Sequence, residues 1–269
     1  MRIITLSSGS AGNCTYLESD KSKILIDVGL TGKMAVNLMT MANIKANEID
    51  AIFVTHEHID HIKGVGVLSR KYDIPIYANA KTWLAMQAKI GKIASKNINV
   101  FKSNTFFSFR DLDIRNVSTF HDAADPVFFV FYQKQQKISI LTDTGIVSRP
   151  IIDAVRDSNV LILESNHDEK RLMEGPYPQS LKYRIRGEYG HLSNDTALDI
   201  VDELVKAQGE KIILGHLSST NNSKEIVYSG MENLLVNKGI KIGDDLDLEV
   251  SEEFKLGKLI DLGGDYSWI

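Results

Sequence analysis

The chain has 269 residues, 43% of them hydrophobic and 25% charged, and carries a formal net charge of −4 at pH 7. Such a length suits one large domain or two small ones, and the composition is that of a globular protein with a substantial core. The negative charge argues against nonspecific coating of nucleic acid, so any contact with nucleic acid requires a local patch.

The N-terminal residues combine an apolar strand pattern at 2–7 with a loop of small residues at 8–13. They lack the apolar core of a secretory signal, and no run approaches the ~18 apolar residues of a membrane helix. The sole cysteine, Cys14, excludes an internal disulfide framework. We therefore expect a cytoplasmic protein with no membrane contact.

In the loop of small residues at 8–13, Ser8, Ser10 and Asn13 are candidates to bind phosphate. An ordinary turn is the alternative.

Short β-branched and aromatic runs alternate with helical patterns along the rest of the chain. The predicted strands lie at 2–7, 14–19, 22–28, 50–55, 74–78, 112–120, 126–133, 137–142, 159–164 and 211–215. Helical patterns lie near 31–41, 61–71, 80–90, 148–156, 194–207 and 223–236. The pattern at 194–207 is the clearest, with Ser193 or Asn194 as its N-cap. No linker is evident, so we expect two face-to-face sheets with helices outside, in one domain spanning 1–269.

The segment 169–190 fits neither the helical nor the strand period. Its Gly-Pro and Tyr-Pro pairs favour turns, so we expect a long irregular excursion over the surface. Basic and aromatic residues are interleaved in it: Lys170, Arg171, Tyr177, Lys182, Tyr183, Arg184, Arg186 and Tyr189. This composition is typical of a nucleic-acid groove, with Lys182 and Arg184 as candidate phosphate ligands, and a solvated loop face is the alternative.

The stretch VTHEHIDHIKG at 54–64 places four potential metal ligands within six residues, directly after an apolar strand. These ligands are His56, His58, Asp60 and His61. Imidazole nitrogen and carboxylate oxygen together suit zinc, iron or manganese. A polar loop that happens to contain three histidines is the alternative, but the whole chain has only seven histidines.

Other candidate ligands recur in the same context, each just after the end of an apolar strand. They are Asp27, His121, Asp143 and His216. A single aspartate in such a place is usually a turn residue. If the strands share a sandwich, however, their ends meet at one rim, and the pattern then predicts a metal centre there.

The HxHxDH motif at 56–61, with the surrounding Asp, His, Asp and His in the same order, resembles the metallo-β-lactamase superfamily. The resemblance spans residues 2–219. The strings SSGSAGNCTYL, LILESNHD, GPYP and GHLSND are similar to the YycJ/WalJ-type branch of bacterial metallohydrolases. This resemblance implies an α/β fold, the four-layer αββα metallo-β-lactamase sandwich.

The resemblance also implies a centre of two divalent metal ions, either zinc, manganese or iron. The implied ligands form two groups and a bridge: His56, His58 and His121; Asp60, His61 and His216; and Asp143 between the ions. Asp27 is expected to orient a ligand histidine from behind. Two such ions lower the pKa of bound water and hold both the nucleophile and a phosphoryl oxygen, and Asp60 counts among the catalytic groups as well.

The tetrapeptide GHLS occurs twice, at 190–193 and at 215–218. His216 follows an apolar strand like the other ligands, whereas His191 precedes a helix whose N-terminus suits a phosphate. In related phosphodiesterases a histidine in this place stabilises the phosphoryl transition state or protonates the leaving oxygen. We therefore expect a catalytic His191 with Glu164 as its acidic partner; a capping or packing role is the alternative. His167 is expected on the surface or behind the ligands.

The implied function is a metal-dependent phosphodiesterase that hydrolyses nucleic acid. The finer resemblance implies a 5′-to-3′ DNA exonuclease acting by attack of metal-bound hydroxide on phosphorus. The alternatives are a phosphodiesterase of small or cyclic phosphate esters, a thioester hydrolase of the glyoxalase II type, and a non-catalytic metal-binding regulatory protein. The chain has no room for the large clamp domain of many related nucleases, and no obligate protein partner is evident.

Overall fold

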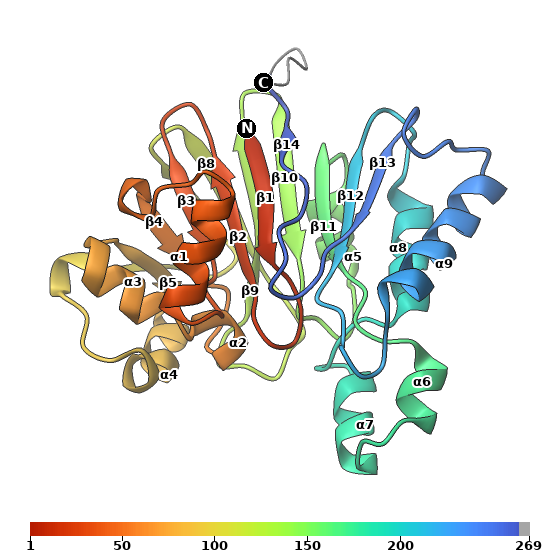
Figure 1. The fold of residues 1–269 in the computed structure, drawn as a ribbon, viewed down its shortest axis with the longest axis horizontal. Coiled ribbons are helices and arrows are strands. Elements are labelled where there is room, and N and C mark those ends of the chain that lie inside the picture. The colour runs from red at the N-terminus through yellow and green to blue at the C-terminus, as the bar shows by residue number, and fades with distance from the viewer. Residues whose placement is uncertain (264–269) are drawn as a thin grey trace.

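A computed structural model describes residues 1–263, which form two seven-stranded sheets packed face to face (Figure 1). The first sheet has the order β14 (Ile260–Asp261), β1 (Arg2–Ser7), β2 (Cys14–Glu18), β3 (Lys23–Ile26), β4 (Ala51–Phe53), β5 (Ile76–Asn79) and β6 (Ile98–Phe101). The second has the order β13 (Asp247–Val250), β12 (Lys211–Gly215), β11 (Val160–Glu164), β10 (Gln136–Leu141), β9 (Val127–Gln133), β8 (Leu112–Ser118) and β7 (Phe106–Phe109). In the first sheet, the β2–β3 pair is antiparallel and the pairs from β3–β4 onward are parallel. In the second sheet, the β9–β10 pair is antiparallel and the pairs from β10–β11 onward are parallel.

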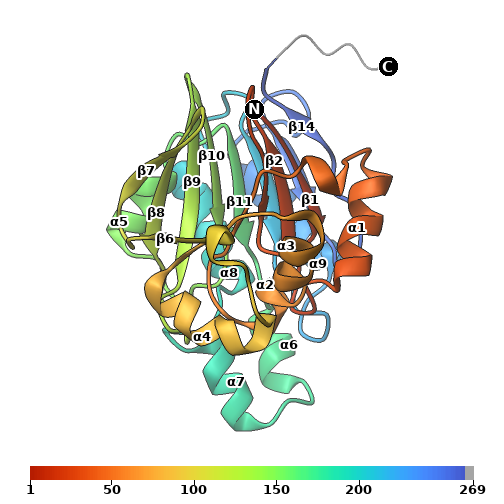
Figure 2. The same ribbon diagram turned by 90° about the vertical axis from the view of Figure 1, so that its left-hand side faces the viewer.

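Helices cover the outer face of each sheet. The first sheet packs against α1 (Gly32–Met41), α3 (Val65–Tyr72) and α4 (Ala80–Ile90), and the second against α5 (Arg149–Val155), α8 (Asn194–Leu204) and α9 (Lys224–Asn237). Figure 2 shows α1 outside the first sheet and α5 outside the second. The four-layer αββα arrangement predicted from the sequence is therefore confirmed.

Strands that are buried on both faces explain the continuous apolar runs in the sequence. In β3, Ile24 and Ile26 point into the core between the sheets, while Leu25 packs against the helices of the first sheet. In β4, Ala51 and Phe53 face the core between the sheets, and Ile52 faces the helices. The alternation along each strand thus fills two apolar cores at once.

The helix predicted at 194–207 is present as α8, although it ends at Leu204. Ser193 caps it, because the Ser193 hydroxyl accepts a hydrogen bond from the Thr196 N–H. Ala197, Ile200, Val201 and Leu204 form its buried face. The N-cap residue and the apolar stripe in the sequence therefore predicted this helix correctly.

The irregular excursion predicted for 169–190 is wrong. This segment is a pair of short helices, α6 (Glu169–Glu174) and α7 (Gln179–Arg186), that extends beyond the sandwich in Figures 1 and 2. Asp168 caps α6 by accepting from the Arg171 N–H, and Pro178 stands at the N-cap of α7. Helices of six and eight residues are too short to show a 3.6-residue apolar period.

The remaining short elements lie in loops: η1 (Ala46–Glu48), α2 (Ile59–Ile62) and η2 (Ser95–Asn97). The loop and helix α2 that follow β4 lie at the same end of the sandwich as the segment that follows β11 and leads into α6 (Figure 1). Both are carboxyl ends of strands in the parallel parts of the two sheets. Polar side chains from the two sheets therefore meet at this end.

Candidate metal centre

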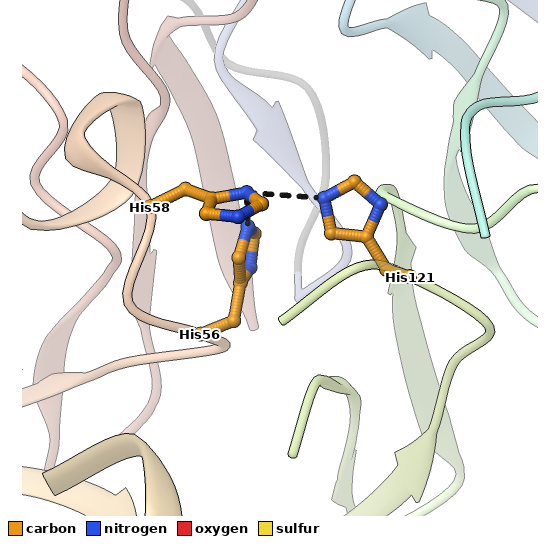
Figure 3. Close-up of side chains that lie close together, drawn as sticks. All are labelled: His56, His58 and His121. Carbon is orange, nitrogen blue, oxygen red and sulfur yellow. Dashed lines mark hydrogen bonds between the residues drawn. The ribbon is translucent and has the colours of Figure 1, made fainter. Parts of the chain in front are cut away.

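Three histidines converge across the seam between the sheets (Figure 3). His56 and His58 follow β4 of the first sheet, and His121 follows β8 of the second. The Nδ1 atom of His58 lies 3.2 Å from His56 Nε2 and 3.2 Å from His121 Nε2. His56 and His121 are buried. Three imidazole nitrogens gathered in this way form a group that could hold a metal ion.

A second group lies beside the first. The Asp60 Oδ2 atom is 3.4 Å from His61 Nε2 and 3.6 Å from His216 Nε2. Asp143 stands between the two groups, because its Oδ2 atom is 3.3 Å from His61 Nε2 and its Oδ1 atom is 3.8 Å from His121 Nε2. The seven candidate ligands thus lie together in overlapping groups, one of which also includes Glu164 and His191.

Two buried polar atoms at the centre of this arrangement test whether a metal fits. Asp143 Oδ2 and His216 Nε2 have no hydrogen-bond partner among the described residues. A buried polar atom without a partner costs free energy, and native proteins rarely leave one unsatisfied. Carboxylate oxygen and imidazole nitrogen are the donors that zinc, iron and manganese accept. The residues present therefore fit divalent cations.

Burial and neighbouring charges shift the pKa values of the candidate ligand histidines in opposite directions. Burial lowers the pKa of His56 well below its usual range, and the neighbouring His61 adds to this effect. Burial also acts on His61 and His216, but the nearby carboxylates, Asp143 foremost, outweigh it and raise both pKa values well above the usual range. The same histidines lower the pKa of Asp60 against the effect of burial. A metal must therefore compete with protons for His61 and His216.

Asp27 lies directly behind the ligands. Its Oδ2 atom is 2.7 Å from His61 Nδ1, and it accepts hydrogen bonds from both the N–H and the hydroxyl of Thr55. The Thr55 hydroxyl is also 3.0 Å from His56 Nδ1. The Asp27–Thr55 pair therefore orients one histidine of each group. Sequence reasoning identified Asp27 but missed Thr55, which precedes the motif and carries no signal of its own.

Glu164 joins the two GHLS histidines. Its Oε1 atom lies 2.7 Å from His191 Nδ1 and 2.8 Å from His216 Nδ1, and Oε2 accepts from the N–H groups of Thr144 and Leu192. The carboxylate is fully buried, but the two histidines outweigh the effect of burial and lower its pKa. The structure brings Glu164 to His191 as expected, and the second contact, to His216, was not foreseen.

Three residues that close the strands have left-handed backbone conformations. The φ angles are 57° at Asp27, 58° at Asp143 and 55° at His216. This region is unfavourable for residues other than glycine, and such outliers concentrate at functional sites. The sharp turn at each strand end aims the side chain across the rim toward the others.

A cavity of about 260 Å³ opens over the candidate ligands. Its lining residues are Ser10, His58, Ile59, Asp60, Asp143, Arg184, His191 and His216. Of the candidate phosphate ligands, Ser10 and Arg184 lie in this lining. Asn13 instead contacts the ligands, with Nδ2 3.1 Å from His61 Nε2. Ser8 is buried, and its hydroxyl accepts from the His216 N–H.

Several basic residues of 169–190 are engaged within the protein. The expectation for Lys182 needs correction, because its buried ammonium donates to the Met173 carbonyl, 2.7 Å away, and does not reach the cavity. Arg184 forms an ion pair with Asp122, which also lies 3.6 Å from His121 Nε2. Arg186 pairs with Glu169. The segment therefore offers less free positive charge than its composition suggested.

His167, the remaining histidine, is buried, and neither of its ring nitrogens has a hydrogen-bond partner among residues 1–263. Burial lowers its pKa. This excludes the surface position that was one of the two expected for it.

The model of the metallo-beta-lactamase superfamily matches residues 8–216. The chain is 40% identical over 243 residues to exodeoxyribonuclease YycJ of Bacillus anthracis, covering 90% of this chain and 92% of that protein. It is 41% identical over 242 residues to exodeoxyribonuclease WalJ of Streptococcus pneumoniae D39, covering 89% and 90%. The solved structure of YhfI, a metallo-beta-lactamase fold protein of Bacillus subtilis, superposes with a TM-score of 0.70 at 15% identity, covering 96% of this chain and all of the other.

Proposed function

Because this chain belongs to the metallo-β-lactamase superfamily, we propose that it is a metal-dependent nuclease that hydrolyses DNA from its ends. The observation that carries this proposal is the identity of about 40% to two exodeoxyribonucleases along nine-tenths of the chain. The candidate ligand groups on either side of Asp143 support it, since phosphodiester hydrolysis by paired metal ions needs such a site.

The residues present would hold two divalent ions, either zinc, manganese or iron. His56, His58 and His121 would hold one ion and Asp60, His61 and His216 the other, with Asp143 lying between the two groups. Ions bound there activate water and neutralise charge on a phosphoryl group. Asp27 and Glu164 fix the orientation of His61 and His216 through their Nδ1 atoms, so that each Nε2 atom points toward the centre.

His191 and Arg184 are the proposed substrate residues. His191 lines the cavity, and Glu164 holds its Nδ1 atom, which leaves the other ring nitrogen to donate a hydrogen bond or a proton to a phosphoryl or leaving oxygen. Arg184 presents a guanidinium at the same cavity and can bind a phosphate oxygen in exchange for Asp122. Ser10 adds a hydroxyl at the rim.

The proposed substrate is a DNA end, hydrolysed in the 5′-to-3′ direction in the cytoplasm. None of the helices in the described part of the chain is long and apolar enough to span a membrane.

An end-labelled digestion panel tests the proposal. DNA and RNA substrates labelled at either end are incubated with Mn²⁺, Zn²⁺, Fe²⁺ or Mg²⁺, beside the variant His58→Ala. We expect stepwise loss of nucleotides from the 5′ end of DNA and at least a hundredfold lower rate for His58→Ala. Full activity in that variant would contradict the two-ion centre. Hydrolysis of bis-p-nitrophenyl phosphate without cleavage of any polynucleotide would instead indicate a small-diester phosphodiesterase.

A further inference from the structure

The backbone of His216 is held by two buried side chains from distant parts of the sequence. His216 adopts a left-handed conformation, with φ at 55°, directly after β12. Its N–H donates to the Ser8 hydroxyl at 2.9 Å, and its carbonyl accepts from Asn166 Nδ2 at 2.8 Å. Ser8 is 5% exposed and Asn166 is 3% exposed, so water does not replace either partner. The main-chain N–H and carbonyl of His216 therefore both form their hydrogen bonds with side chains.

Asn166 also ties together the two loops that carry GHLS. Its main-chain N–H donates to the Leu192 carbonyl at 2.9 Å, in the first copy. Its main-chain carbonyl accepts from the Ser218 N–H at 2.8 Å, in the second copy. One residue thus forms three hydrogen bonds that set the His191 loop and the His216 loop relative to each other.

The glycine before His216 is part of the same arrangement. A Cβ atom at Gly215 would lie 2.6 Å from the Ser8 hydroxyl oxygen, which is closer than real Cβ atoms approach. Glycine at this position leaves room for the Ser8 side chain to reach the His216 N–H. The glycine of the other copy, Gly190, has a different neighbour: a Cβ atom there would lie 2.1 Å from the Ile185 carbonyl oxygen.

We propose that Asn166 and Ser8 are positioning residues, which hold His216 in the strained backbone conformation that aims its Nε2 atom at Asp60 and Asp143. A left-handed conformation is strained for a residue other than glycine, so it persists only where the surroundings hold it. Without these two bonds, the peptide relaxes toward an extended conformation and the imidazole turns away from the other ligands. The inference rests on the proposed metal centre but not on the identity of the substrate.

The variants Asn166→Ala and Ser8→Ala test this role, with Asn116→Ala as the matched control. Asn116 is a buried asparagine in β8 whose side chain donates to the carbonyls of Lys102 and Thr105 rather than to a loop that carries GHLS. Zn²⁺ affinity and stoichiometry are measured by competition with a chromophoric chelator, without substrate. We expect Asn166→Ala and Ser8→Ala to weaken one of the two ions by about 10–100-fold, as for other residues that support metal ligands. Asn116→Ala should lower the unfolding temperature but leave both affinities unchanged.

The double variant sharpens the test. Since both side chains act through His216, the combined loss of Zn²⁺ affinity should be smaller than the product of the two single losses. In DNA digestion, kcat should fall while KM changes little, because neither side chain lines the cavity. If Asn166→Ala does not fold, Ser8→Ala, which removes one hydroxyl, decides alone.

Wild-type Zn²⁺ affinity in Ser8→Ala or Asn166→Ala would overturn the inference, as would an equal loss in Asn116→Ala. A wild-type protein that binds two Zn²⁺ ions but cleaves no polynucleotide would overturn the proposed function and leave the positioning role intact. The two failures are therefore distinguishable.

Discussion

His191 and His216 occur in the same tetrapeptide and share one carboxylate oxygen of Glu164, yet their other ring nitrogens face different surroundings. The side chain of His216 is 1% exposed, and its Nε2 atom lies 3.5 Å from Asp143 Oδ1. Both histidines line the cavity, but the side chain of His191 is 20% exposed. Because His191 is the more accessible of the two to a substrate, the two histidines suit different tasks.

We therefore expect His191→Ala to keep both metal ions and to lose turnover by roughly 10²–10⁴-fold, the usual range for a general acid or base. Metal content of the purified variant and kcat on DNA are measured together. His216→Ala is the matched comparison from the other GHLS copy, and it should lose metal as well as activity. Normal turnover in His191→Ala would reduce this histidine to a capping or packing residue.

At the residue scale, the sequence predicted the candidate ligands because each one stands just after an apolar strand. It could not predict Thr55, Asp122 or Asn166, since their roles depend on contacts with Asp27, Arg184 and His216, which lie far from them in the sequence. The Asn166 side chain, for example, meets a carbonyl 50 residues away. Only the folded chain places such residues behind the ligands.

At the scale of elements, all ten predicted strands are present, with bounds that differ by a few residues. The unpredicted strands are the edge strands of the two sheets: β6, β7, β13 and β14. They are two to four residues long, and β6 and β7 are partly exposed, so their apolar pattern is weak. The pair α6–α7 was missed for a related reason, since each helix is shorter than the window in which a helical period is visible.

Helix α7 places one arginine over the cavity and another away from it. Arg184 lines the cavity, whereas Arg186 pairs with Glu169. We expect Arg184→Ala to raise KM for DNA about tenfold, the effect of losing one charge-assisted hydrogen bond to a phosphate, and to change kcat little. Steady-state kinetics of Arg184→Ala and Arg186→Ala measure this. Equal effects of the two substitutions would point to general charge rather than to a specific contact.

At the scale of the molecule, the candidate centre crosses the seam of the sandwich. Its first-sheet ligands all lie in the segment 56–61 after β4. The second sheet contributes His121, Asp143 and His216, from the loops after β8, β10 and β12. The two sheets otherwise meet through an apolar core that includes Phe53, Phe129 and Phe131.

The single domain predicted for 1–269 stays a prediction, and residues 264–269 lie outside the described residues.

A centre that spans both sheets must couple metal binding to the stability of the whole sandwich. A ligand present at a hundredfold excess over its Kd stabilises the folded state by about 2.7 kcal/mol, and a chain of this size gains roughly 2–4 °C in unfolding temperature per kcal/mol. We therefore expect a strong chelator to lower the unfolding temperature by about 5–10 °C in differential scanning calorimetry, and added Zn²⁺ or Mn²⁺ to restore it. In Asp143→Ala the metal-dependent part should disappear, because this carboxylate contacts both ligand groups, whereas Arg186→Ala should keep it. An unfolding temperature insensitive to chelation in a metal-loaded protein would mean that the ions do not join the two sheets.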